Sequence, residues 1–150
     1  MEVHVKRFEE LSAAQLYKIL RLRVAVFVVE QCCLYQDLDD LDQDALHVWL
    51  EDENGVAAYL RVLDRGVESE HVSIGRVVTR DRRRGLGSVV LREGIRAARE
   101  RLGADSIYLE AQAYARAFYE RQGFRAFGEP FLLDGIPHCK MLLEQAGEET

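Results

Sequence analysis

Residues 45–64, ALHVWLEDENGVAAYLRVLD, restrict the possible folds of this chain more than any other stretch. Two runs rich in β-branched and aromatic residues flank Asn54-Gly55, a dipeptide typical of tight β-hairpins. An antiparallel hairpin therefore precedes the first helix that can connect two parallel strands. This order argues against a regular doubly wound sheet and predicts a mixed α/β fold.

Strands and amphipathic helices account for most of the remaining sequence. Residues 3–8 alternate apolar and polar side chains and predict a strand. A helix is predicted over 11–28, where Ser12 and Gln15 have capping-box spacing. The other predicted elements are a long loop at 30–44, a strand at 71–79, a helix from about 86 to Gly103, a strand at 106–112, a short helix at 113–123 and two strands within 124–144.

The length of 150 residues is that of one domain, and a single domain is predicted over 1–150 with a frayed acidic tail at 145–150. No apolar run approaches the ~20 residues that span a bilayer, and the N-terminus lacks a signal-peptide core. A cytoplasmic protein without membrane contact is expected. The three cysteines, of which Cys32 and Cys33 are adjacent, are expected to be reduced thiols.

Charge is distributed unevenly along the chain. The formal net charge of -6 argues against a nucleic-acid partner, which would require a broad basic surface. Five arginines fall within residues 76–84, whereas five aspartates fall within 37–44. The two groups could receive an anionic and a cationic ligand respectively, the second being an amine. The alternative for each is a solvated face.

A predicted strand, two glycines and a helix start meet in TRDRRRGLGSVVL, residues 79–91. Free backbone N–H groups at a helix start favour an anion, and glycines allow close approach of a phosphate. A P-loop would end in Gly-Lys-Ser/Thr, which is absent, and a dinucleotide fingerprint fails at Val90. The remaining alternative to a phosphate site is a tight turn before a solvated helix.

Two segments resemble the GNAT N-acetyltransferase superfamily. RRRGLG, residues 82–87, matches its R/Q-x-x-G-x-G/A motif, and QAYARAFYERQGF, residues 112–124, is similar to its N-x-x-A-x-x-L-Y-x-x-x-G-F segment. More narrowly, VFVVEQ (26–31), YLEAQ (108–112) and DGIPH (134–138) resemble the ElaA branch. The resemblance implies a GNAT fold, with a twisted mixed sheet of about seven strands flanked by about four helices.

The resemblance also implies acetyl-CoA as co-substrate and indicates which residues would hold it. The strand before the glycine loop would bind the pantetheine arm, and the loop would bind the pyrophosphate. Gln112 stands where the family usually has Asn, which leaves room for altered contacts with the cofactor. The residues implied are Val77, Val78, Thr79, Arg82, Arg83, Arg84, Gly85, Leu86, Gly87, Ser88 and Gln112.

Acetyl transfer to an amine needs a proton donor for the leaving sulfur and a base for the nucleophile. Tyr119 falls where the family often has its general acid, although its apolar neighbours also fit a core aromatic. Glu110 and Glu30 are the candidate bases, directly or through a water, and each also fits a surface carboxylate. His138 is a candidate lining residue of the acceptor pocket.

No metal is predicted. Residues 40–51 follow a calcium-loop pattern in part, but Ala45 replaces its required glycine. The expected reaction is transfer of the acetyl group to a primary amine of a small molecule or a peptide. The alternative is a non-catalytic CoA-binding or sensor module on the same fold. A monomer and a homodimer both remain open.

Overall fold

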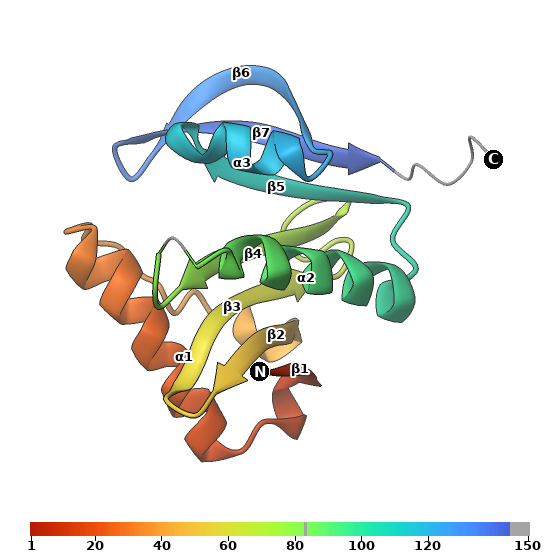
Figure 1. The fold of residues 1–150 in the computed structure, drawn as a ribbon. Coiled ribbons are helices and arrows are strands. Elements are labelled where there is room, and N and C mark those ends of the chain that lie inside the picture. The colour runs from red at the N-terminus through yellow and green to blue at the C-terminus, as the bar shows by residue number, and fades with distance from the viewer. Residues whose placement is uncertain (83, 145–150) are drawn as a thin grey trace.

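The computed structural model describes residues 1–82 and 84–144. Within them lies a seven-stranded sheet of order β1-β2-β3-β4-β5-β7-β6 (Figure 1). The strands are β1 (Glu2–Arg7), β2 (Ala45–Asp52), β3 (Gly55–Leu63), β4 (Val72–Thr79), β5 (Ser106–Gln112), β6 (Arg125–Leu133) and β7 (Ile136–Glu144). The α-helices are α1 (Ala13–Arg23), α2 (Leu86–Leu102) and α3 (Arg116–Arg121).

The predicted fold class is confirmed, and so is the central hairpin. β2 and β3 pair antiparallel around Asn54-Gly55, and Gly55 adopts a φ of 111°, which favours glycine. The expected helix count of about four is slightly too high, because three α-helices form in the described residues. None of their helices is both long and apolar enough to cross a bilayer.

The first helix departs from the prediction at its C-terminal end. Its start is as expected, since the Ser12 hydroxyl accepts from the Gln15 amide and the Gln15 side chain accepts from the Ser12 amide. After Arg23 the chain continues as a π-helix, Val24–Glu30, with a bond from Gln31 N–H to the Val26 carbonyl. Four valines crowd this segment, and β-branched side chains fit an α-helix less well. The wider turns also occur often near functional sites.

Successive residues of the central strands point to opposite faces of the sheet, and both faces are covered by core side chains. Val48 and Leu60 belong to the cluster formed with α2, whereas Trp49 and Tyr59 pack with Ile19 of α1. α2 lies very close to β3, because a Cβ at Gly94 would come within 2.7 Å of Leu60. The sheet is therefore a layer between α1 on one face and α2 on the other.

β4 and β5 part soon after they begin. They pair in parallel only at Val72–Ile107 and Ser73–Tyr108. The register of β4 against β3 then shifts, and Arg76 takes a φ of 55° at the irregularity. Figure 1 shows the result as two groups, β1 to β4 with α1 below, and β5, β7 and β6 with α3 above.

Aspartates of the loop after the π-helix form buried ion pairs with arginines of α1 and β3. Arg23 is fully buried and binds Asp37 (Nε–Oδ2, 3.1 Å) and Asp42 (Nη1–Oδ1, 2.7 Å). Arg61 of β3 binds Asp42 (Nη1–Oδ1, 3.0 Å) and Asp39 (Nη2–Oδ2, 2.5 Å). These three carboxylates thus hold the loop against the sheet instead of facing an acceptor amine.

Arg76 connects the same loop to the irregular point of β4. Its Nε lies 2.8 Å from Asp37 Oδ1, and its Nη2 donates to the Asp37 carbonyl at 3.0 Å. The guanidinium also lies over the Tyr35 ring, 5.4 Å from the centroid. A predicted member of the basic group therefore serves to fix the loop over the parting strands.

The ion pairs predict a loss of stability in acid. Burial alone would raise the pKa of Asp39, but Arg61 and Arg76 outweigh burial and lower the pKa to about 2. The pKa of Asp42 is likewise lowered by Arg23 and Arg61 against its burial. A carboxyl whose pKa is lower folded than unfolded stabilises the fold above ~3.9 and loses that effect as the pH falls toward the folded value.

We expect the urea midpoint to fall between pH ~4 and pH ~2, and Asp39→Asn to reduce the slope of that fall. The control is Asp40→Asn, because Asp40 is exposed and its carboxylate meets the Gln43 amide at 2.9 Å. Identical slopes for the wild type and both variants would contradict the assignment.

Candidate functional site

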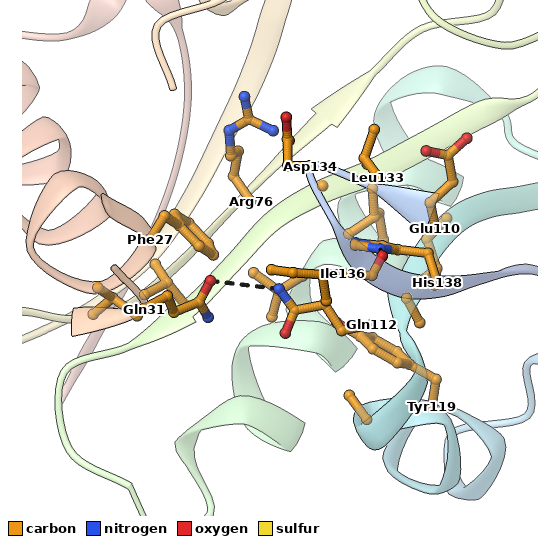
Figure 2. Close-up of a pocket in the computed structure, with 18 of the residues that line it drawn as sticks. Phe27, Gln31, Arg76, Glu110, Gln112, Tyr119, Leu133, Asp134, Ile136 and His138 are labelled. Atoms are coloured by element: carbon orange, nitrogen blue, oxygen red, sulfur yellow. Dashed lines mark hydrogen bonds between the residues drawn. The ribbon is translucent and has the colours of Figure 1, made fainter. Parts of the chain in front are cut away.

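A cleft of about 410 Å³ opens where β4 and β5 separate. Its walls are β4 from Ser73 to Thr79 and β5 from Tyr108 to Gln112. Residues of the π-helix and the following loop close one side, and the turn between β6 and β7 closes another (Figure 2). Beyond Ser73 and Tyr108 no ladder pair joins β4 to β5 in the described chain, so backbone groups on these inner edges face the cleft.

β5 lines the cleft with residues from both of its faces. Leu109 and Ala111 are buried in the cluster with α2, while Tyr108, Glu110 and Gln112 alternate onto the opposite face. Tyr119 of α3 belongs to the α2 cluster, so it approaches the cleft from the other side of the sheet. Donor and acceptor substrates could thus enter from opposite faces.

The glycine loop and α2 form the candidate phosphate corner. Gly85 is the residue before the helix, with a φ of 72° and no side-chain cap on the first amides. A Cβ at Gly87 would lie 3.4 Å from Phe118, so the helix start is closely packed against α3. Uncapped N–H groups at the end of a 17-residue helix, with glycines that expose the backbone, suit a pyrophosphate. Leu86 is buried, and the Ser88 hydroxyl donates to the Gly85 carbonyl at 3.3 Å.

Arginines of this corner are already paired with acids. Arg82 lines the cleft and its Nη2 binds Glu30. Arg84 lies 3.4 Å from Asp81, with both side chains about half exposed. Such exposed pairs are weak and exchange readily with another anion. Arg83, also expected at this corner, lies outside the described residues.

The remaining expected cofactor residues line the cleft. Val77, Val78 and Thr79 do so from β4, and Gln112 does so from β5. The Gln112 amide donates to Gln31 Oε1 at 3.4 Å, across the space between β5 and the π-helix end (Figure 2). The glutamine thus reaches a partner on the opposite wall of the cleft.

Tyr119 lies at the junction of core and cleft. The residue is 9% exposed, and its ring packs edge-on against Phe118 (5.0 Å between centroids) and Phe124 (6.0 Å). Desolvation raises the pKa of Tyr119, so the hydroxyl is protonated at neutral pH. No hydrogen bond joins that hydroxyl to another described residue.

The two candidate bases are in different places. Glu110 lines the cleft and accepts from the Tyr108 hydroxyl at 2.7 Å. Desolvation and then Glu110 raise the pKa of Tyr108, which therefore donates this bond. Glu30 pairs with Arg82 and is not among the described cleft residues. The structure does not bring Glu30 and Glu110 together.

Several cleft residues were not predicted from the sequence. Ser73 is 2% exposed, and its hydroxyl has no partner among the described residues. It lies beside Tyr108 at the last parallel pair, and both line the cleft. Only strand register brings them together, because they are 35 positions apart in the sequence.

His138, a candidate for the acceptor pocket, also lines the cleft. No cluster of metal ligands occurs in the described part of the chain.

The sequence of this chain is similar to those of known proteins. The sequence matches the description "Acetyltransferase (GNAT) domain" over residues 10–145. Escherichia coli ElaA is 41% identical to it over 141 residues, which cover 90% of this chain and 91% of ElaA.

Solved structures agree with the sequence match. An acyl-CoA N-acyltransferase from Pseudomonas aeruginosa is 40% identical and has a TM-score of 0.88, covering 95% of this chain and 99% of that chain. The crystal structure of Escherichia coli ElaA also gives a TM-score of 0.88, at 36% identity and with the same coverage of 95% and 99%.

The phosphate corner predicts that Gly85→Val weakens acetyl-CoA binding by about tenfold or more, because a side chain would cover the helix amides. Gly66→Val is the matched control: its φ of 85° resembles the 72° of Gly85, and nothing lies within 4 Å of either added Cβ. Calorimetric titration measures binding, and the melting temperature tests whether both variants carry similar strain. Equal affinities for the two variants would remove the corner from the cofactor site.

Proposed function

The chain belongs to the GNAT acetyltransferase family, and on that premise we propose that it transfers the acetyl group of acetyl-CoA to a primary amine. The observation that carries the proposal is the cleft between β4 and β5, whose lining includes Thr79 and Arg82, a few residues before the uncapped helix start at Gly85. The α2 amides with Arg82 and Ser88 would hold the pyrophosphate. The inner edge of β4, Val77 to Thr79, would hold the pantetheine arm, with Gln112 facing it from β5.

Direct attack is the simplest reaction for this arrangement. The amine nitrogen forms a bond to the thioester carbonyl carbon, and the carbon–sulfur bond breaks. The amine loses a proton and the sulfur gains one, so no oxidant, reductant or metal is consumed. A β4 backbone N–H free of β5 would stabilise the negative oxygen, an interaction that contributes about 3 kcal/mol in comparable sites.

Tyr119 is the proposed donor to the leaving sulfur. Its hydroxyl is protonated at neutral pH and has no described partner that competes for it. A free thiol titrates near ~8.5, below a buried phenol. Complete proton transfer from Tyr119 is therefore uphill, and hydrogen bonding to the developing thiolate supplies most of the effect.

Glu110 and Glu30 take different parts in this proposal. Glu110 lies on the same face of β5 as Tyr108 and Gln112 and lines the cleft, where its carboxylate would attract a protonated amine. Glu30 lies at the phosphate corner, where it competes with the cofactor for Arg82. The proposed acceptor is a small molecule or a peptide, since both can present a primary amine.

The experiment is a release assay for free CoA with a panel of amines: ethylamine, spermidine, lysine and a short peptide with a free N-terminus. Turnover with at least one amine, and mass-spectrometric detection of the acetylated product, are expected. Binding of acetyl-CoA without turnover across the panel would favour the non-catalytic module.

Tyr119→Phe retains the ring packing and removes the hydroxyl. We expect kcat to fall about 10- to 100-fold, because a single acid or hydrogen-bond donor typically contributes at least this much. The affinity for acetyl-CoA should stay within about twofold. Tyr17→Phe is the control, since Tyr17 is 71% exposed on α1 and is not a described cleft residue. Unchanged turnover in Tyr119→Phe would leave Tyr119 as a core aromatic.

A further inference from the structure

His138 is held in one orientation at the edge of the cleft. It is 7% exposed, and its ring packs at 5.8 Å against Phe131 of the neighbouring strand. Its Nδ1 lies 2.7 Å from the Ile136 carbonyl, which can only accept a hydrogen bond. Nδ1 therefore carries the proton, and the lone pair of the neutral ring is on Nε2.

Nε2 has no hydrogen-bond partner among the described residues, and the side chain lines the cleft. His138 is the register partner of Gln112, so its side chain lies on the same face of the sheet as Gln112 and Glu110. Figure 2 shows the imidazole extending from β7 toward the middle of the labelled side chains. A basic nitrogen of a largely buried ring, without a partner among the described residues, thus faces the cleft.

Unlike Nε2 of His138, the charged groups near the cleft are either already paired or exposed to solvent. Arg76 is paired with Asp37 and Asp39, and Arg82 is paired with Glu30. The carboxylate of Glu110 already accepts from Tyr108.

Glu68, Asp134 and Lys140 are exposed, and Lys140 faces Glu110 across the β5–β7 ladder without a described ion pair. A carboxylate is also a much weaker base than an imidazole at neutral pH. His138 is therefore the described cleft residue best suited to accept a proton.

We propose that His138 is the general base that deprotonates the acceptor amine, an inference that rests on the acetyl transfer proposed above. Nε2 takes one proton from the bound ammonium, which frees the nitrogen lone pair to attack the carbonyl carbon. The second proton that the nitrogen loses balances the one gained by the leaving sulfur. The imidazolium keeps its Nδ1–H on the Ile136 carbonyl and later returns a proton to water. Glu110 stabilises both the incoming ammonium and the imidazolium by charge.

The test compares His138→Asn with His71→Asn. An asparagine amide can still donate to the Ile136 carbonyl, as Nδ1–H does, but it has no counterpart of Nε2. His71 is the control because its Nδ1 bonds the Ser106 hydroxyl at 2.9 Å and it is not a described cleft residue. With the best amine of the panel, kcat/KM should fall about 100-fold or more in His138→Asn and stay near wild type in His71→Asn. Affinity for acetyl-CoA should be unchanged in both.

A pair of acceptors separates base catalysis from a merely structural role. Ethylamine is protonated at neutral pH, whereas trifluoroethylamine is largely neutral and needs no base before attack. The defect of His138→Asn should therefore be much smaller with trifluoroethylamine, and imidazole in the buffer should restore turnover to His138→Ala. Equal defects with both amines and no rescue would assign His138 a packing role and overturn the proposal.

A spectroscopic measurement needs no acceptor. Nitrogen-15 NMR should show the Nδ1–H tautomer for His138, and a ring protonated on Nε2 instead would overturn the inference.

Failure of the acetyl-transfer proposal can be distinguished from failure of the proposed role of His138. Loss of all turnover in the wild type rejects acetyl transfer itself and the base with it, whereas an active wild type with an equally active His138→Asn rejects only the base.

Discussion

The cleft depends on two parallel strands that pair over only two residues. After Val72 and Ser73, β4 no longer follows β5, and its inner backbone groups are left without a strand partner. Arg76 marks this point, because it adopts a φ of 55° that is unfavourable for a side chain. Its guanidinium binds Asp37 and Asp39, and these contacts offset the local strain. Without the separation there would be neither a cleft between these strands nor free backbone groups along the inner edge of β4.

Buried ion pairs hold the loop after the π-helix over this region. The sequence contains the charged residues, but it does not indicate which of them pair. Arg23, Arg61 and Arg76 come from α1, β3 and β4, and together they bind three aspartates of one loop. Buried ion pairs contribute little net stability over apolar packing, but removing one partner is costly because it leaves a charge unpaired in the interior. The network therefore specifies one position of the loop. The position also shapes the cleft, because Tyr35, on that loop, is one of its lining residues.

Local patterns were sufficient for most of the fold. The hairpin at Asn54-Gly55, the capping box at Ser12 and the helix stop at Gly103 are formed by neighbouring residues, so the sequence predicts them and the structure contains them. The helix predicted over 11–28 is present, but beyond Arg23 its backbone bonds are of the wider π type, which the spacing of apolar residues does not predict. The sequence also did not predict that aspartates of residues 37–44 would form buried ion pairs. Whether Asp42 faces solvent or Arg23 depends on contacts far apart in the chain.

By itself the sequence determined the mixed α/β class, the glycine loop before α2 and the positions of Tyr119 and Glu110, because motif spacing and strand periodicity are local properties. Only the tertiary structure decided which of these residues share a cleft. It placed Ser73 beside Tyr108, paired His138 with Gln112 across β5 and β7, and placed Glu30 against Arg82. The physical reason is that strand register and side-chain burial are set by packing across the whole sheet, and no short segment contains that information.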